Sequence, residues 1–137
     1  MEITLELLQS PQYSGSMAQH MGVKITSIDN KKATAQLTVD ERHLRPGNIM
    51  NGGISLMLIE TVGSISSMLN IDVTKQNAFG IQVSANHTSI AYPGDILTIA
   101  AEAVHLGRTT HIWDVNIINQ KQKLVSSGRI TMLVTER

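Results

Sequence analysis

The stretch RPGNIMNGGISLMLIETVGSISSMLN, residues 45–70, determines how the rest of the chain must fold. It opens with turn-forming residues, and Asn51 stands directly ahead of Gly52 and Gly53. Asn51 suits the N-cap position, because its side-chain oxygen can accept hydrogen bonds from the free N–H groups at a helix start. The apolar and small residues that follow cover most of a helix circumference, which predicts a long helix buried on nearly all sides.

Glu60 is the one charged side chain between Ile49 and Asn70. Removing an ionised carboxylate from water without partners is costly, so Glu60 must be hydrogen-bonded, neutralised or facing a wet cleft. Carboxylates in partly desolvated clefts have raised pKa values and act as bases or nucleophiles. A structural interpretation is equally open, in which Glu60 lies at an edge of the helix and binds a neighbouring backbone group.

Length and composition fit one domain over residues 1–137, with an N-terminal arm over roughly residues 1–21. A hydrophobic fraction of 42% is enough for a core. The 11 basic and 11 acidic residues cancel, which argues against nucleic acid or an anionic membrane as the main partner. Glu2 and Glu6 stand where a signal peptide would carry lysines and a long apolar core, so a cytoplasmic protein is expected.

Residue types also limit the possible chemistry. The chain has no cysteine, which excludes disulfides, zinc–thiolate sites and thiol nucleophiles. The five histidines show no paired metal-ligand spacing, so we predict no metal site; they are His20, His43, His87, His105 and His111. Glu60 and several serines make the central helix a poor membrane span.

Alternation of apolar and polar residues predicts the strands. Residues 23–28 and 33–39 flank a polar turn and predict a hairpin. After the helix, strands are predicted over residues 79–85, 96–105, 111–117 and 124–134. We expect Phe79, Ile81, Val83 and Ala85 to share one face, and the strand over residues 96–105 to be buried on both faces.

The remaining segments complete the predicted architecture. Short helices are expected within residues 3–9 and 16–21, an irregular lead-in over 40–50 and a polar connection over 72–77. Short turns between strands make neighbouring strands antiparallel. One apolar helix needs a concave surface, which a curled antiparallel sheet supplies. The predicted class is α+β, a long central helix wrapped by a curved antiparallel sheet of about six strands.

The motif Asn51-Gly52-Gly53 is followed by Glu60, nine residues after Asn51, and by Ser64, four residues further on. Ala85-Asn86-His87 and His105-Leu106-Gly107-Arg108 follow later in the chain. Together they resemble the hotdog-fold acyl-CoA thioesterases that act on hydroxybenzoyl-CoA and dihydroxynaphthoyl-CoA, with their phenylacetate-pathway relatives. That family carries HGG at the helix start, then Glu, then Ser or Thr four residues on. The likeness extends from about residue 22 to residue 134 and implies the hotdog fold.

The resemblance implies hydrolysis of the thioester of an aromatic or medium-chain acyl-CoA. Glu60 would act as a general base on water or as a nucleophile that forms a mixed anhydride, and both routes stay open. The Gly52 backbone N–H would polarise the carbonyl at the positive end of the helix. Ser64 would orient the carboxylate or the water, or would be a small residue that permits close packing. No cofactor is implied, because coenzyme A is part of the substrate.

Two residues depart from the family pattern. Asn51 replaces the usual histidine, and its amide can donate a hydrogen bond but cannot carry a proton at neutral pH. Asn51 could therefore position a thioester oxygen or act only as the N-cap, but it could not shuttle protons. Arg45 stands where relatives often have Gln. It could bind an anionic group of the acyl portion or pair with Glu60.

The resemblance also suggests which residues contact the substrate and coenzyme A. Arg108, the Gly107 backbone and the hydroxyl groups of Thr109 and Thr110 suit a phosphate or pantetheine contact. A plain surface arginine in a hairpin turn and a structural histidine at His87 are the alternatives. The full predicted set is Arg45, Gly80, His87, Thr88, Ser89, His105, Leu106, Gly107, Arg108, Thr109 and Thr110.

In this family, subunits join sheets edge to edge and the cleft lies between two subunits. The resemblance therefore implies a homodimer, or a homotetramer built from such dimers, in which Glu60 faces Asn51 and Gly52 of the partner subunit. The strand over residues 79–85 is the predicted joining edge. Because Asn51 replaces histidine, a catalytically silent acyl-CoA-binding or regulatory module is the alternative function. The paired Asp/His motif of hotdog dehydratases is not visible in this chain.

Overall fold

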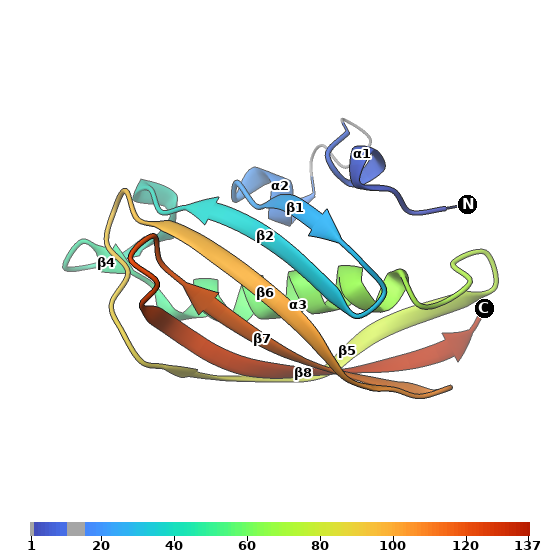
Figure 1. Cartoon of the computed structure of the whole chain (residues 1–137). Helices are drawn as coiled ribbons and strands as arrows, with labels where there is room; N and C mark the ends of the chain where they lie inside the picture. Colours follow the sequence, from blue (N-terminus) through green and yellow to red (C-terminus); the bar gives the residue numbers. More distant parts are fainter. Residues whose placement is uncertain (1, 11–15) are drawn as a thin grey trace.

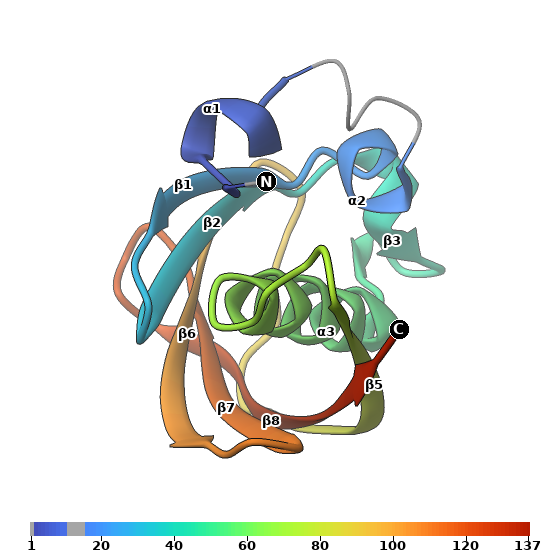
Figure 2. The same ribbon diagram turned by 90° about the vertical axis from the view of Figure 1, so that its right-hand side faces the viewer.

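The computed structural model describes residues 2–10 and 16–137, and its centre is the helix α3 (Gly52–Met68). A six-stranded antiparallel sheet with the strand order β1-β2-β6-β7-β8-β5 curves around this helix, as Figures 1 and 2 show. The strands are β1 (Lys24–Ile28), β2 (Lys32–Thr38), β5 (Gln76–His87), β6 (Ile96–Leu106), β7 (Thr110–Ile118) and β8 (Leu124–Glu136). The predicted α+β arrangement is confirmed.

The core lies between α3 and the concave face of the sheet. Leu58, Ile59 and Val62 are fully buried on the helix, and Trp113 and Val115 are fully buried on β7. Burying a large apolar side chain contributes roughly 1.5–3 kcal/mol, so this layer supplies the main driving force for folding. Along β2 and β7, buried side chains alternate with more exposed ones, and the buried ones lie on the concave face towards α3. This confirms the alternation from which these strands were predicted.

Burial of α3 on nearly all sides is a prediction that the structure corrects. The side of α3 that faces the sheet is buried, but Gly53 and Glu60 are exposed, and Met57, Thr61 and Ser64 are half-buried. The sheet wraps only part of the helix circumference (Figure 2). One face of α3 therefore remains open along the middle of the helix.

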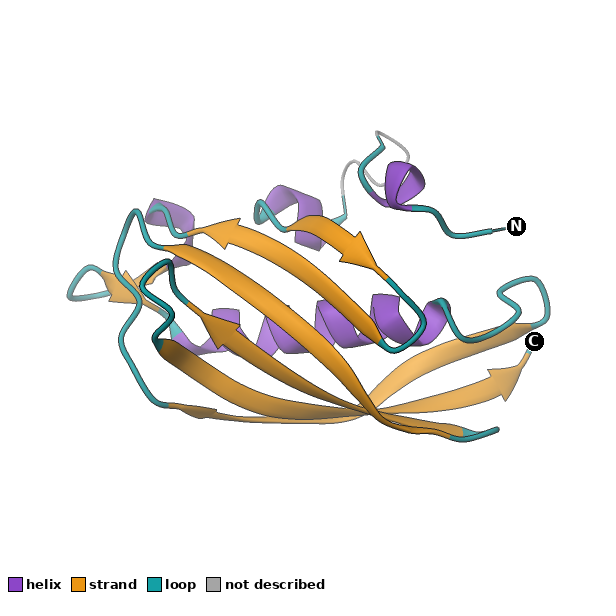
Figure 3. Cartoon of the chain, viewed as in Figure 1, coloured by secondary structure: helices purple, strands orange, loops and turns teal. Residues whose placement is uncertain are grey.

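The lead-in to α3 is more regular than predicted. A 3₁₀ turn (Glu41–His43) is followed by a small hairpin of β3 (Leu44–Arg45) and β4 (Ile49–Met50), seen beside the start of α3 in Figure 3. The buried ring of His43 accepts a hydrogen bond from the Asp40 N–H at 2.9 Å and lies 2.7 Å from the carbonyl oxygen of Met21. These bonds fix where the chain enters α3.

Strand β5 begins at Gln76, inside the segment predicted as a polar connection, and its faces differ from the predicted ones. The ladder with β8 shifts register between Gly80 and Gln82, so Ile81 is an extra residue, a β-bulge. Phe79 and Ile81 are 53% and 58% exposed, whereas Val83 packs against the core. The bulge reverses the alternation, so the four apolar residues of this strand do not share one face.

Strand β6 is buried on one face only, contrary to the prediction. Leu97 and Ile99 are fully buried, while Ile96 and Val104 are 44% and 49% exposed. The apolar residues of the second register simply lie on the convex side of the sheet, because no further layer covers it within the described residues.

The N-terminal arm contains α1 (Leu5–Leu8) and α2 (Met17–His20), which confirms the two predicted short helices. Helix α1 packs beside β1 (Figures 1 and 2). Gly22 ends α2 with a φ of 84°, a conformation that favours glycine. Residues 1 and 11–15 of the predicted arm lie outside the described residues.

Candidate functional site

The N-terminus of α3 presents a free backbone donor. Asn51 is the N-cap, and its Oδ1 accepts a hydrogen bond from the Gly53 N–H at 2.8 Å, as predicted. The Asn51 N–H itself donates to the carbonyl oxygen of His43 at 2.9 Å. Among residues 2–10 and 16–137, no acceptor binds the Gly52 N–H. This group therefore points its hydrogen outward at the positive end of the helix dipole.

His87 lies against the same helix start. A Cβ atom added to Gly52 would be 2.8 Å from His87 Nε2, so the imidazole occupies the space that a side chain would need. His87 Nδ1 lies 2.6 Å from the Oγ of Ser126, its direct partner in the β5–β8 ladder. The sheet register thus places the imidazole over the start of α3.

A cavity of about 140 Å³ lies beside Gly52 and His87. Ser55, which is only 1% exposed, is among the residues that line this cavity, and its Oγ has no hydrogen-bond partner among the described residues. The remaining lining residues are Ile49, Met50, Ser89, Ile90, Ala91, Val125 and Ser126. The cavity is therefore apolar on one side and polar on the side of the helix start.

Sequence reasoning missed Ser55 and the role of Ser126. Ser55 is one of several small residues in an apolar run, and nothing in its position distinguishes it from a packing residue. Ser126 lies within the predicted last strand, but its bond to His87 depends on a ladder between strands far apart in sequence.

Glu60 lies in the middle of α3 on the open face. Its side chain is exposed, and within the described residues it forms no hydrogen bond or ion pair. Its Oε1 lies directly above Gly80 of β5, because a Cβ atom on Gly80 would be only 2.8 Å away. The predicted tie to a neighbouring backbone group is absent, and the carboxylate faces open space.

Ser64 follows Glu60 by one helical turn. Its hydroxyl contacts the Sδ of Met132 at 3.8 Å and forms no bond with the Glu60 carboxylate. Its part in orienting the carboxylate or a water molecule stays a prediction.

Gly52 and Glu60 are too far apart to act on one carbonyl group within a single chain. Eight residues separate them on one helix, and at 1.5 Å per residue this is about 12 Å along the axis. Within one chain, the helix start and Glu60 are therefore two separate places on α3.

Arg45 is exposed in the β3–β4 hairpin, and Gly47 lies beside its guanidinium group. No ion pair within 4.0 Å joins it to Glu60. Of its two predicted roles, pairing with Glu60 does not occur within one described chain.

The predicted coenzyme contacts fall at two places. Ser89 lines the cavity at the helix start, and the Thr88 hydroxyl donates to the carbonyl oxygen of Leu124 at 2.7 Å. His105, Leu106, Gly107, Arg108, Thr109 and Thr110 form the turn between β6 and β7. Thr110 on β7 pairs with Leu133 on β8, and Leu133 pairs with Phe79 on β5. The turn therefore lies two strands away from Gly80, the residue beside Glu60.

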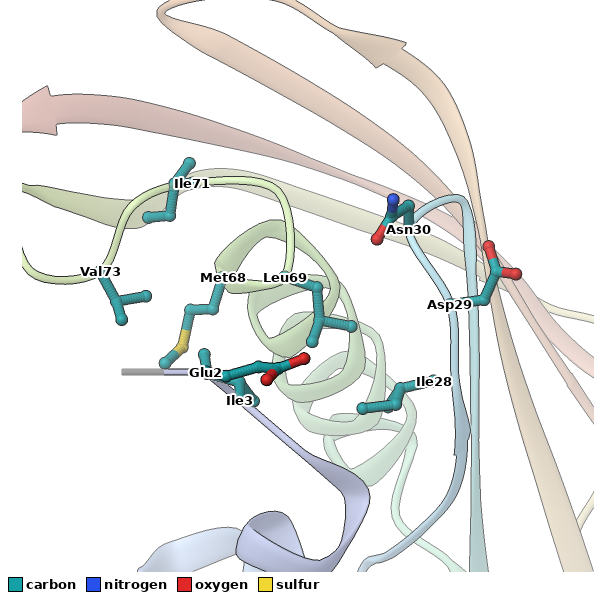
Figure 4. A pocket seen from close by; sticks show the side chains of 9 residues that line it. All are labelled: Glu2, Ile3, Ile28, Asp29, Asn30, Met68, Leu69, Ile71 and Val73. Atoms are coloured by element: carbon teal, nitrogen blue, oxygen red, sulfur yellow. The ribbon is translucent and has the colours of Figure 1, made fainter.

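A larger cavity, of about 350 Å³, lies at the opposite end of α3 (Figure 4). It is formed by the N-terminal arm, the β1–β2 turn and the segment after α3, with Glu2, Ile28, Met68 and Val73 among its lining residues. It contains none of the predicted site residues. Chemistry, rather than volume, therefore identifies the smaller cavity and Glu60 as the candidate site.

Two further searches concern only the described residues. No group of three or more histidine, aspartate or glutamate side chains is arranged to hold a metal ion. None of the helices in these ranges combines the length and the apolar character needed to cross a membrane.

Comparisons with known proteins match nearly the whole chain. Residues 47–126 match the family model of the thioesterase superfamily. Thioesterase PA1618 of Pseudomonas aeruginosa is 35% identical over 95% of this chain and 88% of its own. The solved structure of a mutant of that protein has a TM-score of 0.93 at 32% identity, over 100% of this chain and 97% of that one.

Two more relatives carry informative names. A 1,4-dihydroxy-2-naphthoyl-CoA hydrolase of Listeria monocytogenes is 31% identical over 88% of this chain and 97% of its own. A hypothetical thioesterase of Streptococcus pneumoniae, solved with coenzyme A, is 27% identical with a TM-score of 0.77, over 85% of this chain and 88% of that one.

Proposed function

The chain belongs to the thioesterase superfamily and is a thioester hydrolase of the hotdog fold, and from that premise we propose that it hydrolyses an aromatic or medium-chain acyl-CoA. The observation that carries the proposal is the carboxylate of Glu60, which has no partner among the described residues and lies on the open face of an otherwise uncharged helix. The names of the Listeria and Streptococcus relatives support coenzyme A thioesters as the substrate class.

Glu60 activates the attacking group in this proposal. As a general base, its carboxylate takes a proton from water while the water oxygen bonds to the thioester carbon. As a nucleophile, it bonds to that carbon itself and gives a mixed anhydride, which water then hydrolyses. In both routes the carbon–sulfur bond breaks and the electron pair leaves with sulfur. Gly80 supports the assignment, because the absence of a side chain there leaves room for the carboxylate.

The Gly52 N–H binds the thioester oxygen in the proposed site. Negative charge grows on that oxygen during attack, and a free N–H at a helix N-terminus stabilises it. The Asn51 amide group, whose Oδ1 is used as the N-cap, still offers its Nδ2 hydrogens to the same oxygen. Ser64 orients the carboxylate or the water.

The complete site is proposed to lie between two subunits. The axial separation of about 12 Å between Gly52 and Glu60 supports this, because the two groups can reach one carbonyl only if they come from different chains. Strand β5 ends the sheet and exposes Phe79 and Ile81, which suits an edge-to-edge join. A homodimer, with a homotetramer of such dimers, is the proposed assembly.

Coenzyme A is proposed to contact both predicted stretches. The His105–Thr110 turn carries an exposed Arg108 with no ion pair among the described residues, which suits a phosphate group. Arg45, Gly80 and the residues 87–89 complete the proposed substrate contacts. The reaction needs no cofactor beyond the coenzyme A of the substrate, and the cytoplasm is the proposed location.

A complementation experiment tests the catalytic group and the two-chain site together. Glu60→Gln removes the carboxylate and should lower thiol release from a panel of acyl-CoAs by about 10²–10⁴-fold. Gly52→Pro removes the N–H and, through its Cβ, also displaces the His87 imidazole of the same helix start. The backbone should tolerate the change, because proline is accepted at the first helical position and the ψ of 131° at Asn51 suits a following proline. Mixing the two inactive variants should restore about a quarter of the wild-type activity, since half of the random dimers then carry one intact site.

The control is Glu102→Gln, which removes an exposed carboxylate that pairs with Lys32 at 3.4 Å and should keep wild-type activity. Equal rates for wild type and Glu60→Gln would remove Glu60 from the mechanism. No recovered activity after verified exchange of chains would contradict a site shared between subunits.

A further inference from the structure

The hydrogen bond between Ser126 and His87 determines which nitrogen of the imidazole carries the proton. Ser126 is fully buried, and within the described residues its Oγ has one partner, His87 Nδ1 at 2.6 Å. If Nδ1 carried the proton, it would donate to Oγ and the serine hydrogen would have no acceptor, which is costly for a buried hydroxyl. The hydroxyl therefore donates to Nδ1, and the ring proton sits on Nε2.

The Nε2–H group then faces the helix start with nothing to bind. Nε2 lies against Gly52, where a Cβ atom would be 2.8 Å away, and it has no hydrogen-bond partner among the described residues. The Gly52 N–H, also unpaired, belongs to the same residue. Both donors belong to residues that line one small cavity.

An independent feature of this cavity points to a polar occupant. Ser55 is one of the residues that line the cavity and is 1% exposed, and no described residue bonds to its hydroxyl. Buried hydroxyl groups are nearly always hydrogen-bonded, so an orphan of this kind marks a place that a ligand atom or a bound water completes. Donor groups gathered beside the positive end of a helix fit an oxygen atom that gains negative charge.

We propose that His87 is a catalytic residue whose Nε2–H donates a second hydrogen bond to the thioester oxygen, beside the Gly52 N–H. The inference rests on the proposed thioester hydrolysis and adds a group to its site. When the attacking oxygen bonds to the carbonyl carbon, the π electron pair moves onto the carbonyl oxygen, where both donors hold it. When the carbon–sulfur bond breaks, the carbonyl re-forms and the imidazole keeps its proton throughout. Ser126 is a positioning residue that fixes the ring and its proton.

The test compares variants of His87 and Ser126 in the full chain with an acyl-CoA that the wild type hydrolyses. His87→Ala should lower kcat by about 10²-fold with KM changed less than threefold, as expected for losing one donor to a transition-state oxygen. His87→Gln, which keeps a neutral N–H donor, should recover at least a tenth of the wild-type kcat. Ser126→Ala should lower kcat about tenfold, because the ring is no longer held. His20→Ala, an exposed histidine in the N-terminal arm, is the control.

The outcomes separate this inference from the proposed function. If Glu60→Gln is inactive while His87→Ala keeps its kcat or loses only KM, His87 is a binding residue and the inference is wrong, although the proposed function stands. Nitrogen-15 NMR of the imidazole gives a second readout, in which wild type should show the proton on Nε2. A proton on Nδ1 in the wild type would also overturn the assignment.

Discussion

Two buried serines on the same helix have opposite surroundings. Near the end of α3, Ser67 is fully buried and its Oγ accepts from Trp113 Nε1 at 2.7 Å, while His111 Nδ1 lies 3.1 Å away. Near the start, Ser55 is 1% exposed and has no partner among the described residues. Within the described residues, the serine hydroxyl near the end of α3 is therefore hydrogen-bonded and the one near its start is not.

Under the proposed function, this difference assigns one end of the helix to the architecture and the other end to chemistry. A satisfied buried network stabilises one arrangement of helix and sheet, whereas an unsatisfied polar group is retained only where something else uses it. The two ends also differ in their glycines. Gly63 meets the rigid, buried side chain of Ile130, and Gly52 meets the tip of the exposed imidazole of His87.

The glycine pair gives the largest expected contrast. Gly63→Ala places a methyl group on the Cγ2 of Ile130, and overpacking of this kind should lower the free energy of unfolding by about 1–3 kcal/mol. Gly52→Ala meets only the tip of the His87 imidazole, so its cost should come from disturbing the His87–Ser126 hydrogen bond, at most about 0.5–1.5 kcal/mol, and should stay below that of Gly63→Ala. Its thioesterase activity should fall, because the imidazole is displaced.

Urea unfolding and thiol release, measured on both variants, check this prediction. Equal losses of stability at the two positions would show that the helix start is as tightly packed as the middle. Full activity in Gly52→Ala would show that the position of His87 does not matter.

The serine pair gives the next contrast, and here the signs differ. Ser67→Ala removes the acceptor of the buried Trp113 N–H, which should cost about 1–3 kcal/mol of unfolding free energy. Ser55→Ala removes a hydroxyl that bonds to nothing in the described chain, so stability should stay the same or rise. Thermal unfolding monitored by circular dichroism measures both. A loss for Ser55→Ala that matches Ser67→Ala would mean that the folded chain itself satisfies Ser55.

Local patterns in the sequence predicted the helix and the strands well, because their causes are local. The Asn51 cap depends on the next two residues, and its bond to the Gly53 N–H is present. Alternation located the hairpins and the antiparallel order. Glu60 stood out since a lone charge in an apolar run is visible without a structure.

Features that depend on distant contacts were not predictable from one sequence. The bulge at Ile81 changes the faces of β5, and Gly80 beside it is compatible with a bulge without establishing that one forms there. Ser55 and Ser67 look alike in the sequence, and the partners that distinguish Ser67 are 44 and 46 residues away. The catalytic roles of Glu60, Gly52 and Ser64 remain predictions that the experiments above address.

The smallest effect concerns pH and the closed end of α3. Burial lowers the pKa of His111; its hydrogen bond with the Gly107 backbone raises it, and the nearby His105 lowers it again. The unfolded chain therefore takes up this proton at a higher pH than the folded chain. By linkage, the free energy of unfolding should fall as the pH drops through the ordinary titration range of histidine, and it should be regained above that range.

Urea unfolding between about pH 8 and about pH 5 measures this slope. His111→Gln keeps a neutral polar side chain and should flatten the slope relative to wild type, whereas His20→Gln, at an exposed position, should leave it unchanged. This pH dependence arises at the end of α3, where the Ser67 hydroxyl links the side chains of Trp113 and His111. Ser67→Ala should therefore alter the slope, and Ser55→Ala should not. A slope that is the same in wild type and His111→Gln would mean that the ring is open to water when the chain is folded, and the contrast between a closed and an open end would then rest on Ser67 alone.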